Sequence, residues 1–275
     1  SSAASDVYKR QARVYNFEPV AEELTPEEKA RIIGVQGCIW TEWTKDSVKM
    51  EWQMMPRIAA LSELQWSNPK QKNLDNFLGR LRHQLDLYIL YGYHYKQDID
   101  DANIDINAGE NGQALVTLST FDNAPVVYTT DGSEPTASST AYTEPFPVQG
   151  SQTIKAKAIR NGRESETTEE TLSFNLATMR PITLASEPDK GYTFKGAALL
   201  NDGLKGDGNY RSGRYMGFYS NNVDATVDLQ SEQEISEAFI DTYLVPGDYI
   251  FGLTGMEVYV SSDGKSFSKV ASKQI

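Results

Sequence analysis

The chain has too few cysteine and histidine residues for several kinds of site. Its 275 residues include one cysteine, Cys38, and two histidines, His83 and His94. A single cysteine excludes an internal disulfide framework and a cysteine-rich zinc site. Two histidines leave little material for a histidine-based metal centre or a Ser-His triad. We therefore expect no such centre and no bound cofactor, and any chemistry must rest on carboxylates, amides and aromatic side chains.

Long apolar runs and an excess of positive charge are also missing. No uncharged apolar run approaches the roughly 20 residues of a membrane-spanning helix, so we expect no membrane span. The 26 basic residues are outnumbered by 38 acidic ones, which gives a net charge of −12. Because nucleic-acid-binding proteins neutralise phosphates with a basic surface, we expect no nucleic-acid partner. The hydrophobic fraction of 39% is that of a folded protein.

From about residue 13 to residue 96 the pattern predicts helices around one strand. Thr25 and Glu28 have the spacing of a capping box, which begins a short helix. Residues 32–40 are apolar without alternation, which favours a parallel strand covered on both faces, with Cys38 buried in it. A buried strand among helices is typical of the edge of an α/β architecture.

Two further helical stretches follow that strand. Residues 48–66 have helical spacing, and Pro56 either kinks the helix or begins a second one. The next helix is predicted most clearly and ends before Gly92. We expect Trp66 in the core and His83 on an exposed face. The apolar residues of the clearest helix are Leu74, Phe77, Leu78, Leu81, Leu85 and Tyr88.

A linker and then a β domain are predicted next. Residues 97–107 are rich in Asp and Asn and lack aromatic residues, which predicts a linker. Over residues 108–176 the apolar period changes to two, as at residues 154–158, and the Asn-Gly pair at 161–162 is a hairpin turn signal. We expect a small antiparallel β-sandwich. Residues 101–175 hold 11 acidic and 4 basic residues, which indicates a solvated charged surface.

Residues 177–275 predict a third, glycine-rich β domain. Apolar and polar residues alternate over residues 223–229 and again over residues 256–260. The Ser-Asp-Gly-Lys sequence at residues 262–265 is a turn signal. Because the sequence ends soon afterwards on a strand-like stretch, we expect this domain to be cut short.

Six short motifs in the first part of the chain resemble one enzyme family. They are VYNFEP (14–19), IGVQ (33–36), WTE (40–42), PR (56–57), AALSE (59–63) and WS (66–67). Their order and spacing resemble the end of the catalytic barrel of glycoside hydrolase family 20, the β-N-acetylhexosaminidases, over residues 13–96. Residues 1–12 resemble nothing in that family and are left outside the domain.

Two later stretches resemble domains that accompany this barrel. YTTDGSEPT (128–136) and IKAKA (154–158) resemble the chitobiase-type C-terminal β domain. LNDG (200–203) and VYVSSDG (258–264) resemble the discoidin-like, carbohydrate-binding jelly roll. The resemblance therefore implies a multi-domain chain: the C-terminal part of a (β/α)8 TIM barrel, a small antiparallel β-sandwich and an incomplete β jelly roll.

The family resemblance implies a substrate-assisted retaining mechanism, an exception to the two-carboxylate scheme. The 2-acetamido oxygen of the sugar attacks C1, an aspartate orients that group, and a glutamate protonates the leaving oxygen. In the family this Asp-Glu pair lies on the fourth barrel strand, and no stretch of this chain resembles it. We therefore expect no catalytic residue here, no turnover by this chain alone, and a missing N-terminal part of the same enzyme as its partner.

Trp40 and Glu42 are the predicted substrate-binding residues. The resemblance implies that Trp40 forms the apolar floor beneath the sugar ring and that Glu42 accepts hydrogen bonds from the O4 and O6 hydroxyls. Alternate residues of an extended strand share a face, so both side chains should point the same way. Without the family, a packed tryptophan and a solvated acid are the simpler interpretation.

The third domain offers two sets of polar and aromatic side chains. One set either stacks on glycans or packs in the domain core; it consists of Tyr210, Tyr215 and Phe218. The other set either supplies oxygens to a structural calcium ion or forms plain Asx turns; it consists of Asn201, Asp202, Asp207 and Asn209.

Two functions from different classes remain open. The first is the C-terminal part of a periplasmic, cell-surface or extracellular β-N-acetylhexosaminidase that releases terminal N-acetylglucosamine or N-acetylgalactosamine from glycans. The second is a non-catalytic glycan-binding or spacer assembly in which the barrel remnant is vestigial. An Asp-Glu pair in the protein upstream of residue 1 would favour the enzyme.

Overall fold

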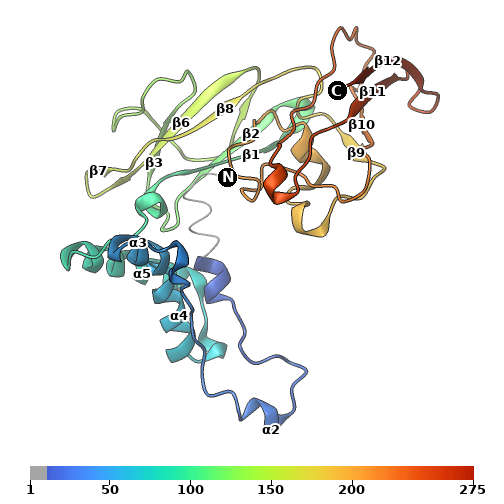
Figure 1. Cartoon of the computed structure of the whole chain (residues 1–275). Helices are drawn as coiled ribbons and strands as arrows, with labels where there is room; N and C mark the ends of the chain where they lie inside the picture. Colours follow the sequence, from blue (N-terminus) through green and yellow to red (C-terminus); the bar gives the residue numbers. More distant parts are fainter. Residues whose placement is uncertain (1–10) are drawn as a thin grey trace.

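Three parts follow one another along the chain (Figure 1). The computed structural model describes residues 11–275, so the predicted N-terminal stretch 1–12 lies almost wholly outside the described residues. We call residues 11–100 the helical segment, residues 103–172 the sandwich and residues 181–275 the C-terminal segment. In Figure 1 the blue and cyan helical segment lies below the green and yellow sandwich, and the orange and red C-terminal segment lies beside the sandwich.

The helical segment is built on one long helix. Helix α5 (Leu74–Leu90) buries the apolar face that the sequence predicts, with Leu85 fully buried. Asn73 caps the start of α5 by accepting a hydrogen bond from a backbone N–H of the first turn. Helix α4 (Arg57–Trp66) buries Ala60 in the same apolar cluster.

Short elements complete the helical segment. Residues 11–15 are helical. The other elements are α2 (Pro26–Lys29), η1 (Thr41–Trp43), α3 (Ser47–Met54), η2 (Pro69–Gln71) and η3 (Gln97–Asp100). The capping box is confirmed, because Glu28 Oε2 accepts from Thr25 N at 2.9 Å and Thr25 Oγ1 accepts from Glu28 N at 3.3 Å. Pro56 lies between α3 and α4, so it begins a second helix. No helix among residues 11–275 is long and apolar enough to cross a membrane.

The sandwich consists of two antiparallel sheets. One has the strand order β1-β2-β5, and the other has the order β4-β3-β6-β7 with β8 also paired to β6. Ile106, Val116 and Ile154 face the shared core and are at most 1% exposed. Asn161 and Gly162 form the predicted hairpin turn with φ angles of 51° and 77°. The strands are β1 (Asn103–Ala108), β2 (Ala114–Ser119), β3 (Val126–Thr129), β4 (Thr140–Ala141), β5 (Phe146–Val148), β6 (Gln152–Arg160), β7 (Arg163–Glu164) and β8 (Thr168–Leu172).

The C-terminal segment has little regular structure. It contains two pairs of strands, β9 with β10 and β11 with β12. Two separate two-stranded sheets do not make a complete jelly roll, and Phe239 is 64% exposed. Its elements are β9 (Ile182–Leu184), η5 (Lys190–Tyr192), η6 (Gly196–Leu200), β10 (Ala225–Val227), η7 (Pro246–Asp248), β11 (Gly255–Val260) and β12 (Ser268–Gln274).

Arg160 connects the sandwich to the helical segment. Its guanidinium donates two hydrogen bonds to Asp122, at 2.7 and 2.8 Å, and a third to the carbonyl oxygen of Asp100. The two charged side chains are only 15% and 9% exposed. The guanidinium lies 5.5 Å from the ring of Phe121, which packs into the apolar cluster of the helical segment. This junction therefore combines a largely buried bidentate ion pair with an apolar contact.

A comparable junction holds the C-terminal segment to the sandwich. Arg214 pairs with Glu170 of β8, and the two side chains are 13% and 8% exposed. Asn201 Nδ2 donates to two carbonyl oxygens that follow the sandwich, those of Ala177 at 2.7 Å and Arg180 at 2.8 Å. None of these long-range partners is visible in the local sequence pattern.

The apolar segment 32–40 is not a strand. It has no strand assignment, Ile33 is 101% exposed, and Cys38 is exposed. A buried parallel strand needs a neighbouring strand to pair with, and the described residues supply none next to this segment. Trp66, the last residue of α4, is 89% exposed instead of buried, because no described element covers that end of the helix.

The predicted linker 97–107 instead contains η3 and most of β1. Ile104 and Ile106 are 4% and 1% exposed because they alternate with polar residues and face the sandwich core. Among the Asp and Asn residues that suggested a linker, Asn103, Asp105 and Asn107 lie on the other face of β1, and Asp98 and Asp100 lie in η3.

Candidate functional site

Trp40 and Glu42 lie where the exposed segment 32–40 meets helix α3. Trp40 has an extended backbone and precedes η1, so Glu42 lies inside a single 3-10 turn. The expected arrangement on one face of a strand is therefore not formed, because alternate residues share a face only in extended backbone. Trp40 is 78% exposed and Glu42 is also exposed. Both side chains are accessible from solvent at this turn.

Hydrogen bonds connect this turn to α3. The backbone N–H of Thr44 donates to Thr41 O at 3.0 Å and closes η1. Thr44 Oγ1 lies 2.7 Å from Gln53 Oε1 and 3.5 Å from Trp40 O. The carbonyl oxygen of Gln53 accepts a hydrogen bond from the guanidinium of Arg57. The side chain of Thr44 thus lies between the backbone of Trp40 and the side chain of Gln53, and the backbone of Gln53 is bound in turn by Arg57, the first residue of α4.

Other carboxylates of the helical segment hold helices in place. Glu51 Oε2 accepts from the backbone N–H of His94 at 2.8 Å and lies 2.7 Å from its Nδ1, and these hydrogen bonds lower the pKa of Glu51. Glu63 of α4 pairs with Arg80 of α5 at 2.6 Å, and the hydrogen bond from Arg80 lowers the pKa of Glu63. Because hydrogen bonds favour the charged form of both carboxylates, neither is suited to donate a proton.

The predicted aromatic residues of the C-terminal segment are only partly brought together. Tyr210 and Tyr215 both contact Tyr243, with ring centroids 6.4 and 4.8 Å apart, and Tyr192 lies 6.3 Å from Tyr210. We call these four residues the tyrosine cluster. Phe218 has no ring contact with the cluster in the described part of the chain. Sequence reasoning missed Tyr192 and Tyr243, because they are far from residues 210–218 in the sequence.

Backbone hydrogen bonds orient two rings of the tyrosine cluster. The hydroxyl of Tyr243 donates to Gly208 O at 2.7 Å, and that of Tyr215 donates to Asp207 O. The exposed guanidinium of Arg211 lies 5.2 Å from the ring of Tyr210. The cluster is therefore half-buried, fixed to one loop and bordered by a cation.

The residues considered as calcium ligands make turn hydrogen bonds. Asp202 Oδ1 accepts from Leu204 N at 2.9 Å, and Asp207 Oδ1 accepts from Asn209 N at 2.9 Å. These contacts are those of Asx turns. Burial raises the pKa of Asp202. Within residues 11–275, no group of three or more His, Cys, Asp and Glu side chains is arranged to hold a metal ion.

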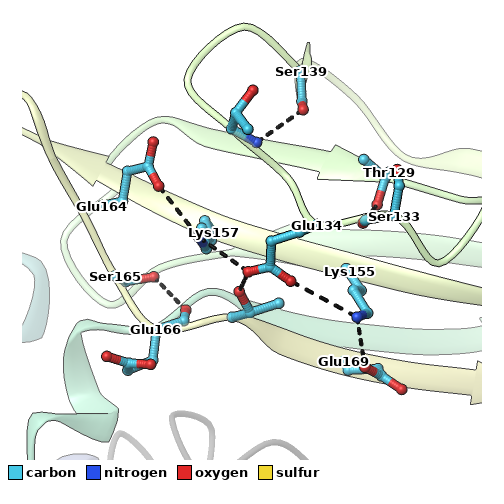
Figure 2. A network of polar contacts seen from close by, with 12 residues as sticks. Thr129, Ser133, Glu134, Ser139, Lys155, Lys157, Glu164, Ser165, Glu166 and Glu169 are labelled. Atoms are coloured by element: carbon cyan, nitrogen blue, oxygen red, sulfur yellow. Dashed lines mark hydrogen bonds and ion pairs between the residues drawn. The ribbon is translucent and has the colours of Figure 1, made fainter.

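The charged surface of the sandwich contains an ion-pair network across β6 (Figure 2). Lys157 Nζ lies 3.1 Å from Glu134 and 3.2 Å from Glu164. Lys155 Nζ lies 3.2 Å from Glu169 and 3.8 Å from Glu134. Hydrogen bonding by Glu134 raises the pKa of Lys157. The lysines and acids neutralise one another, so this network stabilises the sheet face rather than offering a free charged site.

Two family models match the chain. Residues 1–69 match the catalytic domain of glycosyl hydrolase family 20, a range that includes Trp40 and Glu42. Residues 106–170 match the chitobiase/beta-hexosaminidase C-terminal domain. The resemblances of the helical segment and of the sandwich are thus confirmed. The first match begins at residue 1, within the stretch that was expected to match nothing. The discoidin-like resemblance of the C-terminal segment stays a prediction.

Proteins named as hexosaminidases are similar to parts of the chain. A beta-hexosaminidase of Porphyromonas gingivalis is 28% identical over 153 residues, which are 54% of this chain and 20% of that protein. The beta-hexosaminidase subunit alpha of Bos taurus is 41% identical over 70 residues, 26% of this chain and 13% of that subunit. A beta-N-acetylhexosaminidase of Cellulomonas fimi is 29% identical over 83 residues, 30% of this chain and 16% of that enzyme. The chain spans a fifth or less of the length of these relatives.

Proposed function

We propose that this chain is the C-terminal part of a β-N-acetylhexosaminidase, a glycosidase that releases terminal N-acetylglucosamine or N-acetylgalactosamine from glycans. The observation that carries the proposal is the match of residues 1–69 to a family 20 catalytic domain, because this range holds Trp40 and Glu42. The similarity to hexosaminidases from three organisms supports it. A glycan substrate also favours a periplasmic, cell-surface or extracellular location.

In this proposal the reaction is substrate-assisted and retains configuration. The acetamido oxygen attacks C1 while an upstream glutamate protonates the departing oxygen, and an upstream aspartate orients the acetamido group. Water, activated by the same glutamate, then opens the oxazolinium ion. This chain contributes binding: the indole of Trp40 covers the apolar face of the sugar, and Glu42 accepts hydrogen bonds from O4 and O6. Such charge-assisted bonds contribute about 1.5–3 kcal/mol each.

The exposure of Trp40 supports a place in a pocket whose other walls lie outside this chain. An indole that is 78% exposed presents a large apolar surface to water. Covering a large apolar side chain stabilises a protein or a complex by about 1.5–3 kcal/mol. A sugar ring, together with the strands that a barrel places beside residues 32–40, would supply that cover.

The proposal is tested by the substitution Glu42→Gln in a longer protein that includes the upstream Asp-Glu pair. Loss of the charge at O4 and O6 is expected to lower kcat/KM by roughly 10- to 100-fold. Glu23→Gln is the matched control, because Glu23 is an exposed acid of the same segment. Equal kinetics for Glu42→Gln and the control would remove Glu42 from the site. Hydrolysis of a chromogenic N-acetylglucosaminide by residues 1–275 alone would contradict the placement of the proton donor upstream.

The tyrosine cluster supports a second candidate function, glycan binding by the C-terminal segment. Half-exposed rings that are fixed by backbone hydrogen bonds provide flat apolar faces, which sugars contact through their C–H groups. In a titration with N,N′-diacetylchitobiose, Tyr210→Ala is expected to weaken binding roughly tenfold. Tyr219→Ala is the control, because Tyr219 is 81% exposed and lies outside the cluster. Equal affinities for the two variants would show that the cluster only packs the segment.

A further inference from the structure

The turn that carries Trp40 and Glu42 lies between an exposed segment and helix α3. On its N-terminal side lies the exposed segment 32–40, where the amide of Gln65 donates to Val35 O at 2.6 Å. Within the turn, one backbone bond closes η1. If a turn samples several directions, a binding site on that turn loses affinity in proportion to the fraction of time spent in directions that do not bind.

The Thr44–Gln53 contact restrains the turn on helix α3. Gln53 belongs to α3, and Arg57 fixes its carbonyl oxygen at the C-terminal end of that helix. The hydroxyl of Thr44 is half-buried against the Gln53 amide at 2.7 Å. The Thr44 hydroxyl therefore lies within hydrogen-bond distance of an oxygen of α3 and of a backbone oxygen at the start of the turn. The Thr44 hydroxyl donates to Gln53 Oε1, and Trp40 O accepts from the same hydroxyl at the longer distance of 3.5 Å.

We propose that Thr44 and Gln53 are positioning residues, whose hydrogen bond fixes turn η1 on helix α3 and thereby sets the directions of Trp40 and Glu42. This inference rests on the proposed function, because it matters only where Trp40 and Glu42 bind a sugar. Neither positioning residue touches the substrate. They act through the backbone of the turn, and so they determine how accurately Glu42 reaches the O4 hydroxyl.

The first measurement needs only this chain. Thr44→Val keeps the shape of the side chain and removes the hydroxyl, Gln53→Met removes the amide, and Thr44→Ser keeps the hydroxyl. Backbone hydrogen exchange of residues 41–45 is expected to be roughly tenfold faster in the Val and Met variants than in the Ser variant and the unsubstituted chain. Equal exchange in all four proteins would overturn the inference, whatever the chain binds.

The second measurement separates positioning from general stability in the longer protein that contains the upstream pair. Gluco- and galacto-configured substrates differ in the direction of the O4 hydroxyl, which Glu42 is proposed to bind. Thr44→Val is expected to lower kcat/KM roughly tenfold and to change the gluco-to-galacto ratio, with Thr44→Ser restoring both. A purely structural role would lower both activities equally and leave the ratio unchanged, and that outcome overturns the inference.

The two proposals fail in different ways. If Glu42→Gln leaves the kinetics unchanged, the proposed role of Glu42 is wrong and the inference falls with it. If Glu42→Gln lowers activity while Thr44→Val and Gln53→Met do not, the proposed function stands and the positioning role is wrong.

Discussion

Two strands of this chain have similar lengths and different environments. In β6 of the sandwich, Ile154, Ala156 and Ala158 alternate with lysines, and all three apolar side chains are fully buried. In β12 of the C-terminal segment every residue is exposed, although the strand is of similar length. Strand β6 lies between β3 and β8, whereas β12 pairs only with β11 among the described residues. Burial of a strand therefore depends on an alternating apolar face and on the neighbouring strands that cover it.

The apolar segment 32–40 extends the same comparison to the helical segment. It has the composition of a fully buried strand, and Ile33 is completely exposed. The sandwich carries all its partner strands within residues 103–172, but this segment has none beside it among the described residues. The sandwich should therefore unfold as a cooperative unit, and the other two parts should contribute little to the measured stability.

The largest expected effect is that of a substitution in the sandwich core. Leu172→Ala removes a side chain that is fully buried between the sheets. The free energy of unfolding of the variant is expected to be about 3–5 kcal/mol lower than that of the unsubstituted chain, because apolar transfer energy is lost and a cavity remains. Leu244→Ala is the control, since Leu244 is 61% exposed in the C-terminal segment and should change stability by less than about 0.5 kcal/mol. Urea unfolding, monitored by circular dichroism, measures the stability of both variants. Equal losses of stability would contradict the prediction that the sandwich core dominates.

The next effect concerns the junction between the sandwich and the helical segment. Arg160→Met keeps much of the packing on Phe121 and leaves Asp122 as an unpaired, 9% exposed carboxylate. We expect a loss of about 2–3 kcal/mol, below the value for a fully buried pair because Arg160 is 15% exposed. Arg163→Met, on the exposed strand β7, should be nearly neutral. Urea unfolding compares the midpoints of Arg160→Met and Arg163→Met. Similar midpoints would show that the Arg160–Asp122 ion pair does not stabilise the protein.

A pH effect is expected at the same junction. Burial, with the charges of Asp98, Asp100 and Glu166, raises the pKa of Asp101 from 3.8 to about 7. The cations nearby are engaged elsewhere, since Arg82 pairs with the carboxylate of Asp100 and Arg160 with Asp122. The folded protein binds the carboxyl proton of Asp101 more tightly than the unfolded chain does. Protonation of Asp101 therefore stabilises the folded protein at low pH, and this stabilisation is lost as the pH rises through about 7.

The measurement compares urea unfolding at pH 5.5 and pH 8.5. Between these values Asp101 should remove about 1 kcal/mol of stability, a figure reduced for the partial exposure of the side chain. Asp101→Asn stays neutral throughout, so it should be more stable than the unsubstituted chain at pH 8.5 and show a smaller pH dependence. An unchanged pH dependence in Asp101→Asn would assign the titration to another group.

Local chemistry made parts of this structure predictable from the sequence. The apolar face of α5, the capping box at Thr25 and the turn at residues 161–162 each depend on residues close together in the chain. The linker prediction failed for a related reason: Asp and Asn composition suggested a loop, while Ile104 and Ile106 already showed the alternation of a strand. Periodicity was the better guide than composition.

The candidate site was less predictable, because it depends on contacts between distant residues. The sequence placed Trp40 and Glu42 together but gave them the geometry of an extended strand, whereas the chain turns at η1. The Thr44–Gln53 contact has no local signature, because it forms only when α3 folds back beside the turn. Long-range ion pairs such as Arg214 with Glu170 are invisible for the same reason.

The smallest effect is expected from alanine substitutions of two turn glycines, both of which have a left-handed backbone. Gly162 ends the turn between β6 and β7 with a φ of 77°, and Gly264 lies in the turn between β11 and β12 with a φ of 68°. A left-handed backbone at an alanine is unfavourable by about 1 kcal/mol, and neither Cβ atom meets a neighbour within 4 Å. Gly162→Ala should therefore lower the stability of the sandwich by that amount. Gly264→Ala should leave the main unfolding transition unchanged and accelerate hydrogen exchange only in β11 and β12, because that hairpin lies outside the cooperative core. A shift of the main transition by Gly264→Ala would show instead that the C-terminal segment unfolds together with the sandwich, through the Arg214–Glu170 junction that joins them.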